Sequence, residues 1–426
     1  MSIYKPKKKA KYFSTDGKFL PLTMAKDISV GIAMGPDNTY WEYELGVFRR
    51  DPLCVQRRVV EILGDQTTPT HTNKVIHVLD PFLDKLTHDQ PDQSYINLEN
   101  GMYNIKRKKL EDHSPAFHSI VQLPIMYDPD AQCPAFDSFL EKVCPPDSLK
   151  MVWQVIAYLL IPGNFMQQAI LLYGGGSNGK SNFINVMEAL IGKENCSNIT
   201  LKQLSKTFEP AELLGKQLNS VGDLDLRFHE DTEAFKKMVG GDPITAQRKN
   251  KDPFSFVNWA VPLFAANSLW ASVDQSEGYW RRWQIISFPN KVNEHTFEYP
   301  REALTKPTEL AGIFNKAMTY LPELMKKKRF DSNLINELLM SEFQHESDNV
   351  AVWLDDDESI IYSQARDKSV YSRKALSYQL YKQWCYDSNH RPLTNQKFYK
   401  RLIVNGFTFG KKDNQHVVFG LTFKSH

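Results

Sequence analysis

Residues 169–192 contain the sequence feature that most restricts how this chain folds. The segment reads AILLYGGGSNGKSNFINVMEALIG and contains the pattern GxxxxGK[ST] in full, from Gly174 to Ser181. The apolar run Ile170–Tyr173 precedes the pattern and is typical of a buried strand, and the amphipathic run Asn182–Leu190 that follows predicts a helix. A strand, a glycine-rich turn and a helix in this order predict a phosphate-binding loop.

Each residue type in this loop has a physical task. Glycines let the backbone approach phosphate oxygens closely, and the helix N-terminus places a partial positive charge beneath the anion. Lys180 is expected to reach the β and γ phosphates, and Ser181 is expected to ligate Mg²⁺. We therefore expect a site for ATP and Mg²⁺. Its nucleotide-binding residues are Gly174, Gly175, Gly176, Ser177, Asn178, Gly179, Lys180, Ser181 and Asn182.

Two carboxylates follow a short strand-like run in KQLNSVGDLDL, residues 216–226. Hydrolysis of a triphosphate needs a carboxylate at a strand end that holds Mg²⁺ and polarises water. Asp223 is the candidate metal ligand, and Asp223 and Asp225 are both candidate catalytic residues. Because Asn219 and Ser220 lie inside the run, a polar turn is the alternative interpretation.

Two later segments carry a polar side chain at the end of an apolar run. VNWAVPLFAANSLW (257–270) ends its apolar part at Asn267, an amide suited to sensing the γ phosphate or the attacking water, although asparagine is also a common turn residue. EGYWRRWQIISFP (277–289) places Arg281 and Arg282 directly before another strand. These arginines are either surface cations packed on the neighbouring tryptophans or an arginine finger that reaches a neighbour's phosphate.

A charged hairpin is predicted between the carboxylates and Asn267. FKKMVGGDPITAQRKNKDPFSF (235–256) reads as a strand, a charged tip and a second strand. A cationic tip in such a core is suited to gripping the phosphates of a nucleic-acid strand, and an ordinary solvated tip is the alternative. The candidate DNA-binding residues are Arg248, Lys249 and Lys251.

Short apolar strands alternate with helices from Gln168 to about Pro289, which predicts an α/β domain with a parallel sheet flanked by helices. The last part of the chain reads as two helices and two strands, the outline of a winged-helix module. The expected parts are a basic flexible tail (1–25), a mainly helical N-terminal domain (26–150), the phosphate-loop core (151–295), a helical region with an acidic linker at 355–359 (296–360) and a winged-helix-like domain (361–426).

Charge and composition exclude several classes of protein. Lys plus Arg is 52 and Asp plus Glu is 50, so a uniformly basic coat protein is excluded, whereas binding to nucleic acid through clustered charge is not. Five scattered cysteines without a CxxC pair favour a reducing compartment over a disulfide framework or a zinc ribbon. The longest apolar runs, such as Met151–Ile161, are too short to span a bilayer. We expect a soluble protein of the bacterial or host cytoplasm with no membrane partner.

Four segments in this order, LYGGGSNGKS, KKMVGGDPITAQRKN, AANSLW and YWRRWQIISFP, resemble the motifs of superfamily III helicases. The resemblance is to the helicase portion of the poxvirus-type and satellite-phage-type primase-helicases. Upstream, YELGVFRRD, NLENGMYNI and DAQCPAFDSFL are similar to the helical domain that precedes the ATPase in this family. The similarity extends over about residues 38–423.

The resemblance implies an AAA+-type ATPase core that assembles into a ring, usually a hexamer, around single-stranded DNA. It implies ATP bound between subunits and 3′→5′ unwinding of forked DNA in the replication of a phage or mobile element. A primase module has no room before the phosphate loop, so a separate primase or polymerase is an expected partner. The implied roles are nucleotide and Mg²⁺ binding for Lys180 and Ser181, the acidic role for Asp223 with Asp225, a sensor for Asn267, a finger acting in trans for Arg281 or Arg282, and DNA contact for Arg248, Lys249 and Lys251.

The chain departs from the family pattern at two motifs. The acidic motif usually follows a cleaner strand and often has Glu, so the choice between Asp223 and Asp225 stays open. The Asn motif usually has a proline a few residues on, where this chain has Leu269 and Trp270. Two other functions are therefore also considered: an ATP-dependent switch, initiator or packaging motor that binds DNA without unwinding it, and a small-molecule kinase.

Overall fold

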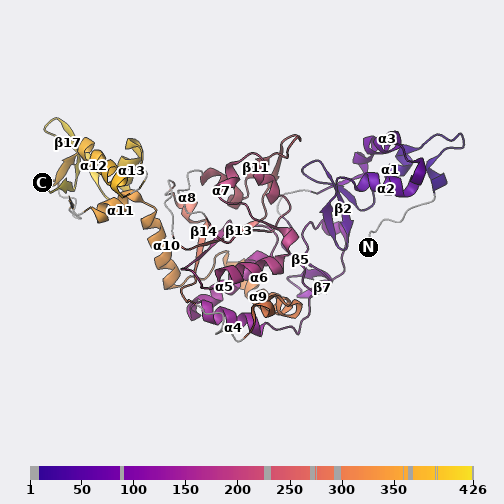
Figure 1. The fold of residues 1–426 in the computed structure, drawn as a ribbon, viewed down its shortest axis with the longest axis horizontal. Helices are drawn as coiled ribbons and strands as arrows, with labels where there is room; N and C mark the ends of the chain where they lie inside the picture. Colours follow the sequence, from indigo (N-terminus) through magenta and orange to yellow (C-terminus); the bar gives the residue numbers. More distant parts are fainter. Residues whose placement is uncertain are drawn as a thin grey trace. The chain divides into compact units, whose positions relative to one another are not determined.

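The computed structural model divides the chain into two compact units (Figure 1). The larger unit comprises the described residues up to 224, those from 233 to 267 and those from 281 to 333, and the smaller comprises Thr232 and the described residues from 268 to 280 and from 334 onward. The structure describes residues 9–86, 91–224, 232–268, 274, 276–291, 299–357, 359–362, 368–388, 390 and 392–424.

A five-stranded sheet in which every neighbouring pair is parallel forms the centre of the larger unit. Ala169–Tyr173, Val261–Ala266 and Trp283–Ser287 are mostly apolar and buried, as parallel strands covered on both faces require, whereas Leu218–Val221 also buries Asn219 and Ser220. The α/β fold with a parallel sheet that we expected is therefore confirmed. The strand order is β14 (Trp283–Ser287), β8 (Ala169–Tyr173), β13 (Val261–Ala266), β10 (Leu218–Val221) and β9 (Cys196–Ser197).

Four helices pack together with this sheet around the largest apolar core of the chain (Figure 1). Proline occupies a first-turn position in α4 and α9, where the N–H group that proline lacks would have no acceptor within the helix. Gly312 lets α9 approach the backbone at Gln132, because a Cβ at this glycine would lie 2.1 Å from the Gln132 carbonyl carbon. The helices are α4 (Pro134–Val143), α5 (Leu149–Leu160), α6 (Lys180–Ile191) and α9 (Pro307–Lys327).

The region before residue 150 contains two sheets as well as helices, whereas we expected a mainly helical domain. Helices α1 (Pro21–Ile28), α2 (Cys54–Leu63) and α3 (Pro69–Leu79) share one apolar cluster. Tyr12 and Met24, in the expected flexible tail, are fully buried in this cluster, and residues 1–8 lie outside the described part. The sheets are β3–β2–β1–β4, from β1 (Ile32–Met34), β2 (Tyr40–Glu44), β3 (Val47–Arg50) and β4 (Asp84–Lys85), and β5–β6–β7, from β5 (Tyr95–Leu98), β6 (Gly101–Asn104) and β7 (Lys109–Glu111).

The acidic segment expected as a linker is instead part of the smaller unit. Asp356 accepts a hydrogen bond from the indole of Trp384 at 2.9 Å, and Asp357 accepts one from Trp353 at 3.1 Å. The limits expected at 295 and 360 also differ from the observed division, because Trp280 packs on Phe343 with ring centroids 4.9 Å apart. The elements of this unit include α10 (Leu334–Glu346), α11 (Asn349–Asp356), β15 (Ile360–Tyr362), β16 (Tyr371–Arg373), α12 (Lys374–Asp387), α13 (Asn395–Val404), β17 (Thr408–Lys412), β18 (Gln415–Phe419) and β19 (Leu421–Phe423).

Among the helices of the described residues, none has the length and the apolar content needed to cross a membrane.

Candidate functional site

The glycine-rich loop between β8 and α6 is fixed at its two ends and open in its middle. At Gly174 a Cβ would lie 2.3 Å from the carbonyl oxygen of Phe288, and at Gly179 it would lie 2.7 Å from Val143, so only glycine fits at either position. A Cβ at Gly175 or Gly176 would meet no atom within 4 Å. The space beside the middle of the loop is therefore open, which leaves room for a phosphate group next to the backbone.

Lys180 opens helix α6 and is only 6% exposed. Its Nζ donates to the carbonyl oxygen of Gly174 at 2.5 Å, to that of Gly175 at 3.0 Å, and to the Oδ1 atoms of Asn178 and Asn267 at 2.9 Å each. Burial lowers the pKa of Lys180, and the carboxylate of Asp223 acts in the opposite direction. The ammonium is thus held at the carboxyl end of the sheet by acceptors from two strand ends.

Asn267 and Asp223 reach the same edge of the sheet from neighbouring strands. β13 pairs with β8 so that Ala266 lies opposite Tyr173, and Asn267 follows directly. β10 pairs with β13 on its other side, and the N–H of Leu224 donates to Ala265 at 2.9 Å, which fixes the turn that carries Asp223. The structure therefore brings Lys180, Asn267 and Asp223 together.

The other candidates for the phosphate and metal sites differ in exposure. Ser181 is exposed in the first turn of α6, whereas Asn182 is 8% exposed, with an Oδ1 atom that has no hydrogen-bond partner among the described residues. Asn178 joins the loop to β14 because its Nδ2 donates to Phe288 at 2.7 Å. Asp225 lies outside the described residues.

Arg281 and Arg282 lie at the opposite edge of the sheet from the glycine-rich loop. They precede β14, which runs parallel to β8, so they are at its amino end. A strand rises about 3.3 Å per residue, so the two edges of five-residue strands are roughly 16 Å apart. Arg281 is exposed, and Arg282 is half-buried. The structure does not bring these arginines to the phosphate loop of the same chain.

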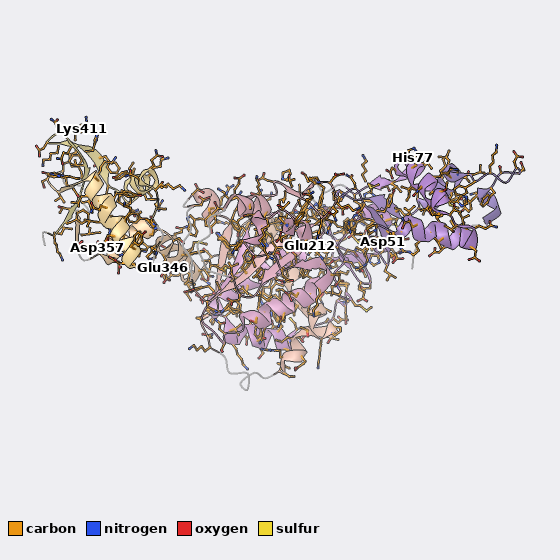
Figure 2. All side chains as sticks on the ribbon, turned by 45° about the horizontal axis from the view of Figure 1, so that its top comes forward. Asp51, His77, Glu212, Glu346, Asp357 and Lys411 are labelled. Atoms are coloured by element: carbon orange, nitrogen blue, oxygen red, sulfur yellow. The ribbon has the colours of Figure 1, made fainter. Side chains whose placement is uncertain are left out.

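The predicted hairpin consists of β11 (Pro243–Ala246) and β12 (Phe254–Val257), which pair in antiparallel register. Lys249 and Lys251 are exposed at its tip. Arg248 instead contacts the chain itself: its guanidinium donates to Glu212 (labelled in Figure 2) at 3.2 Å and lies 3.9 Å from the carboxylate of Asp37. The structure thus presents the two lysines to solvent and gives Arg248 intramolecular partners.

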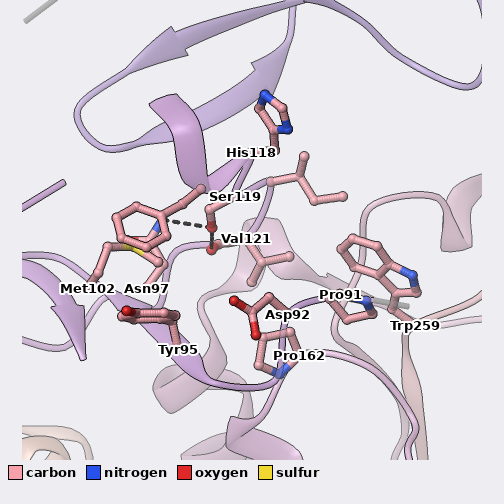
Figure 3. Close-up of a pocket in the computed structure, with 12 residues that line it drawn as sticks. Pro91, Asp92, Tyr95, Asn97, Met102, His118, Ser119, Val121, Pro162 and Trp259 are labelled. Carbon is pink, nitrogen blue, oxygen red and sulfur yellow. Dashed lines mark hydrogen bonds between the residues drawn. The ribbon is translucent and has the colours of Figure 1, made fainter. Parts of the chain in front are cut away.

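A separate cavity of about 170 Å³ lies in the larger unit and contains none of the predicted site residues (Figure 3). Tyr95, Phe117 and Trp259 contribute aromatic walls, and Asp92 and His118 are among its polar groups. The rings of Tyr95 and Phe117 are packed on each other with centroids 4.8 Å apart.

Two contacts at the amino edge of the sheet were missed by the sequence analysis. Gln167 donates from Nε2 to the carbonyl oxygen of Gly240 at 2.7 Å, and Gln168 donates to that of Arg281 at 3.3 Å. Both glutamines precede β8, and their partners are far away in the sequence. Neither a motif nor a periodic pattern marks them, so no sequence signal was available.

Parts of this sequence are weakly similar to known proteins. A family model described as "D5 N terminal like" matches residues 64–145, and a family of unknown function, DUF5906, matches residues 172–282. A putative helicase, L207/L206, of Acanthamoeba polyphaga mimivirus is 25% identical over 228 residues, which is 50% of this chain and 24% of that protein. The match thus spans about a quarter of that relative's length.

Two solved structures of the C-terminal region of NrS-1 are similar to the chain in fold. Each has a TM-score of 0.51, at 13% and 12% identity, and they cover 91% and 92% of this chain and 95% and 96% of their own. Because their identity to this chain is low, these structures show a similarity of fold alone, and the activity of the chain belongs to the proposal that follows.

Proposed function

We propose that the chain is an ATP-dependent, ring-forming DNA helicase of a phage or mobile-element replication system. In this proposal an AAA+-type core hydrolyses ATP with Mg²⁺ at the contact between two copies, and the charged hairpins move single-stranded DNA in the 3′→5′ direction. The similarity of half of this chain to a putative viral helicase supports a nucleic-acid substrate, for which we propose DNA.

The contact between Lys180 and Asn267 carries this proposal. A triphosphate needs a point charge at its β and γ oxygens and a polar group near the γ phosphate, and these two side chains meet at 2.9 Å at the end of neighbouring strands. Asp223 is close enough to influence the pKa of Lys180, so it is suited to holding Mg²⁺ beside Ser181. ATP and Mg²⁺ are therefore the proposed ligands.

The position of the two arginines supports a site shared between copies. Transition-state charge on the γ phosphate is stabilised by an arginine finger in many P-loop enzymes. Because Arg281 and Arg282 are at the far end of the sheet, we propose that they serve the loop of an adjacent chain rather than that of their own. A small-molecule kinase with its catalytic arginine in cis does not fit this placement, and a ring does.

Two surfaces support DNA as the track. Lys249 and Lys251 are both exposed at a hairpin tip, where they are accessible to the phosphates of a single strand. In the smaller unit, β16 precedes α12 and α13, and β17 and β18 follow these helices and form one sheet with β16, an order that supports the proposed winged-helix module. We propose that this unit holds the forked DNA.

Hydrolysis and strand displacement test the proposal together. We expect ATP hydrolysis that single-stranded DNA stimulates, and displacement of a labelled strand from a fork that requires ATP and Mg²⁺. Hydrolysis stimulated by DNA without any displacement would favour the alternative, a DNA-binding switch or motor that does not unwind. No hydrolysis at all by the wild-type chain would overturn the proposal.

A further inference from the structure

The two glutamines before β8 contact two segments that the proposed function uses, the base of the hairpin and the segment that carries Arg281. Gln167 donates to Gly240, in the turn that leads from α7 (Thr232–Gly240) into the hairpin strand β11. Gln168 donates to the carbonyl oxygen of Arg281, at the beginning of β14. A single dipeptide therefore joins the base of the hairpin to the arginine-bearing segment.

Arg282 lies against the same turn. A Cβ at Gly240 would lie 3.0 Å from the guanidinium Nη2 of Arg282 and 3.4 Å from the Oδ2 of Asp242, so this guanidinium fills the space beside the hairpin base. The carbonyl of Arg282 accepts a hydrogen bond from Ala169 at 2.7 Å. Its side chain and backbone are thus both held within its own chain.

The side chain of Arg281, unlike that of Arg282, is exposed to solvent. Gln168 holds the carbonyl oxygen of Arg281, and the N–H of Ala169 holds the carbonyl oxygen of the next residue. An exposed guanidinium on a fixed backbone is suited to reaching a neighbouring molecule, because little freedom is lost when it binds. Arg282, which already contacts the hairpin base, is not available in the same way.

The backbone at Gln167 is also unusual. Its φ is +56°, in the left-handed region that a side chain other than glycine or asparagine seldom adopts. Such a conformation persists only where surrounding contacts hold it, and it is found at functional sites more often than elsewhere. The hydrogen bond to Gly240 is one such contact.

From these contacts we infer that Arg281 is the arginine that acts on the adjoining copy's triphosphate, and that Gln167 and Arg282 are positioning residues that couple it to the hairpin base. The inference rests on the proposed function. When the phosphate that Arg281 contacts is released, a shift of its backbone reaches Gly240 through Gln168 and Gln167, and the tip lysines move with β11. Movement of the tip by DNA is transmitted along the same contacts in reverse.

The test compares hydrolysis without DNA and with saturating oligothymidylate. Gln167→Met keeps the side-chain length and removes the donor, so we expect basal hydrolysis within about twofold of wild type and a large loss of DNA stimulation. Gln167→Gly removes the donor while relieving the left-handed backbone, and we expect the same loss. Gln56→Met, an exposed glutamine on α2, is the matched control and should leave both rates unchanged.

The two arginines are compared in the same assay. Arg281→Met should lower hydrolysis with and without DNA by as much as about 10³-fold, and Arg282→Met should lower it much less. Two outcomes would overturn this inference without affecting the proposed function. One is that DNA stimulates ATP hydrolysis equally in Gln167→Met and in wild type, and the other is that Arg282→Met loses more hydrolysis than Arg281→Met. A wild-type chain that DNA does not stimulate overturns the proposed function instead. If Gln167→Met unfolds, Gln168→Met tests the other half of the connection by the same ratio of rates.

Discussion

The ammonium of Lys180 donates to neutral oxygen atoms, two from the backbone carbonyls of Gly174 and Gly175 and two from the side-chain amides of Asn178 and Asn267. Because it is buried, its removal leaves Asn178 and Asn267 without their donor. We expect Lys180→Ala to abolish ATP hydrolysis and to weaken nucleotide binding, measured by a phosphate-release assay and by titration with a fluorescent ATP analogue. Lys193→Ala, an exposed lysine after α6, is the control and should retain wild-type hydrolysis.

Asp223 is the carboxylate that the structure places beside the loop. If it holds Mg²⁺, Asp223→Asn removes a charged oxygen ligand while keeping the shape of the side chain. We expect turnover to fall by about 10²-fold or more and the Mg²⁺ concentration for half-maximal hydrolysis to rise. A Mg²⁺ titration of hydrolysis measures both. If Asp225→Asn has the larger effect in the same titration, then Asp225 is the ligand.

At the residue scale, sequence patterns identify side chains by their neighbours in the chain and cannot identify remote partners. The motif GxxxxGK[ST] located Lys180, and the end of an apolar run located Asn267, and the structure brings these two together. Arg248 was selected because it is at a charged tip, yet Glu212 and Asp37 bind its guanidinium. No local pattern contains that information, because these acidic residues lie far away in the sequence.

At the scale of elements, helices and strands bounded by strong local signals were predicted best. The helix at Cys54–Leu63 has apolar residues at helical spacing and is followed by Gly64, so local signals in the sequence mark both the helix and its end. In residues 97–115 the sequence has one clear turn signal, Asn100-Gly101, which accounts for the pair β5 and β6, whereas no comparable signal marks β7, which pairs with β6. Short strands such as β7 depend on their neighbours, so tertiary pairing decides them.

The approach of helix α9 to the backbone at Gln132 predicts a cost for any side chain at Gly312. An added methyl group would overlap backbone atoms that cannot move independently. We expect Gly312→Ala to lower the free energy of unfolding by about 1–3 kcal/mol, measured by urea denaturation. Gly222→Ala, where a Cβ meets nothing within 4 Å, should not show this loss.

The hairpin tip predicts a salt-dependent effect on DNA binding. Lys249→Ala and Lys251→Ala each remove one exposed cation, so we expect weaker binding to single-stranded DNA, with the slope of log affinity against log salt lowered by about one per lysine. Fluorescence anisotropy at several salt concentrations measures this slope. Basal hydrolysis should be unchanged. An unaltered slope in both variants would mean that the tip does not bind phosphate.

At the scale of the whole molecule, the sheet separates the two parts of the proposed catalytic site. Its carboxyl edge carries the loop with Lys180, and its amino edge carries Arg281 and the hairpin base. This separation follows from the parallel direction of the strands, which sequence alternation predicted. The number of copies that complete the site does not follow from the fold of one chain, because a single chain has the same internal contacts in any ring.

Mixing two inactive variants tests whether the site is shared. A Lys180→Ala chain has an intact Arg281, and an Arg281→Ala chain has an intact loop, so an assembly of both contains some contacts in which each side supplies its intact part. With equal amounts and random assembly, about a quarter of the contacts are of this kind. We therefore expect hydrolysis to reappear on mixing, up to about a quarter of the wild-type rate if contacts act independently. The rate should rise as the subunits exchange. Each variant alone at the same total concentration is the control, and hydrolysis that stays at the level of the separate variants, in mixtures shown by mass to contain both, would mean that Arg281 does not act between chains.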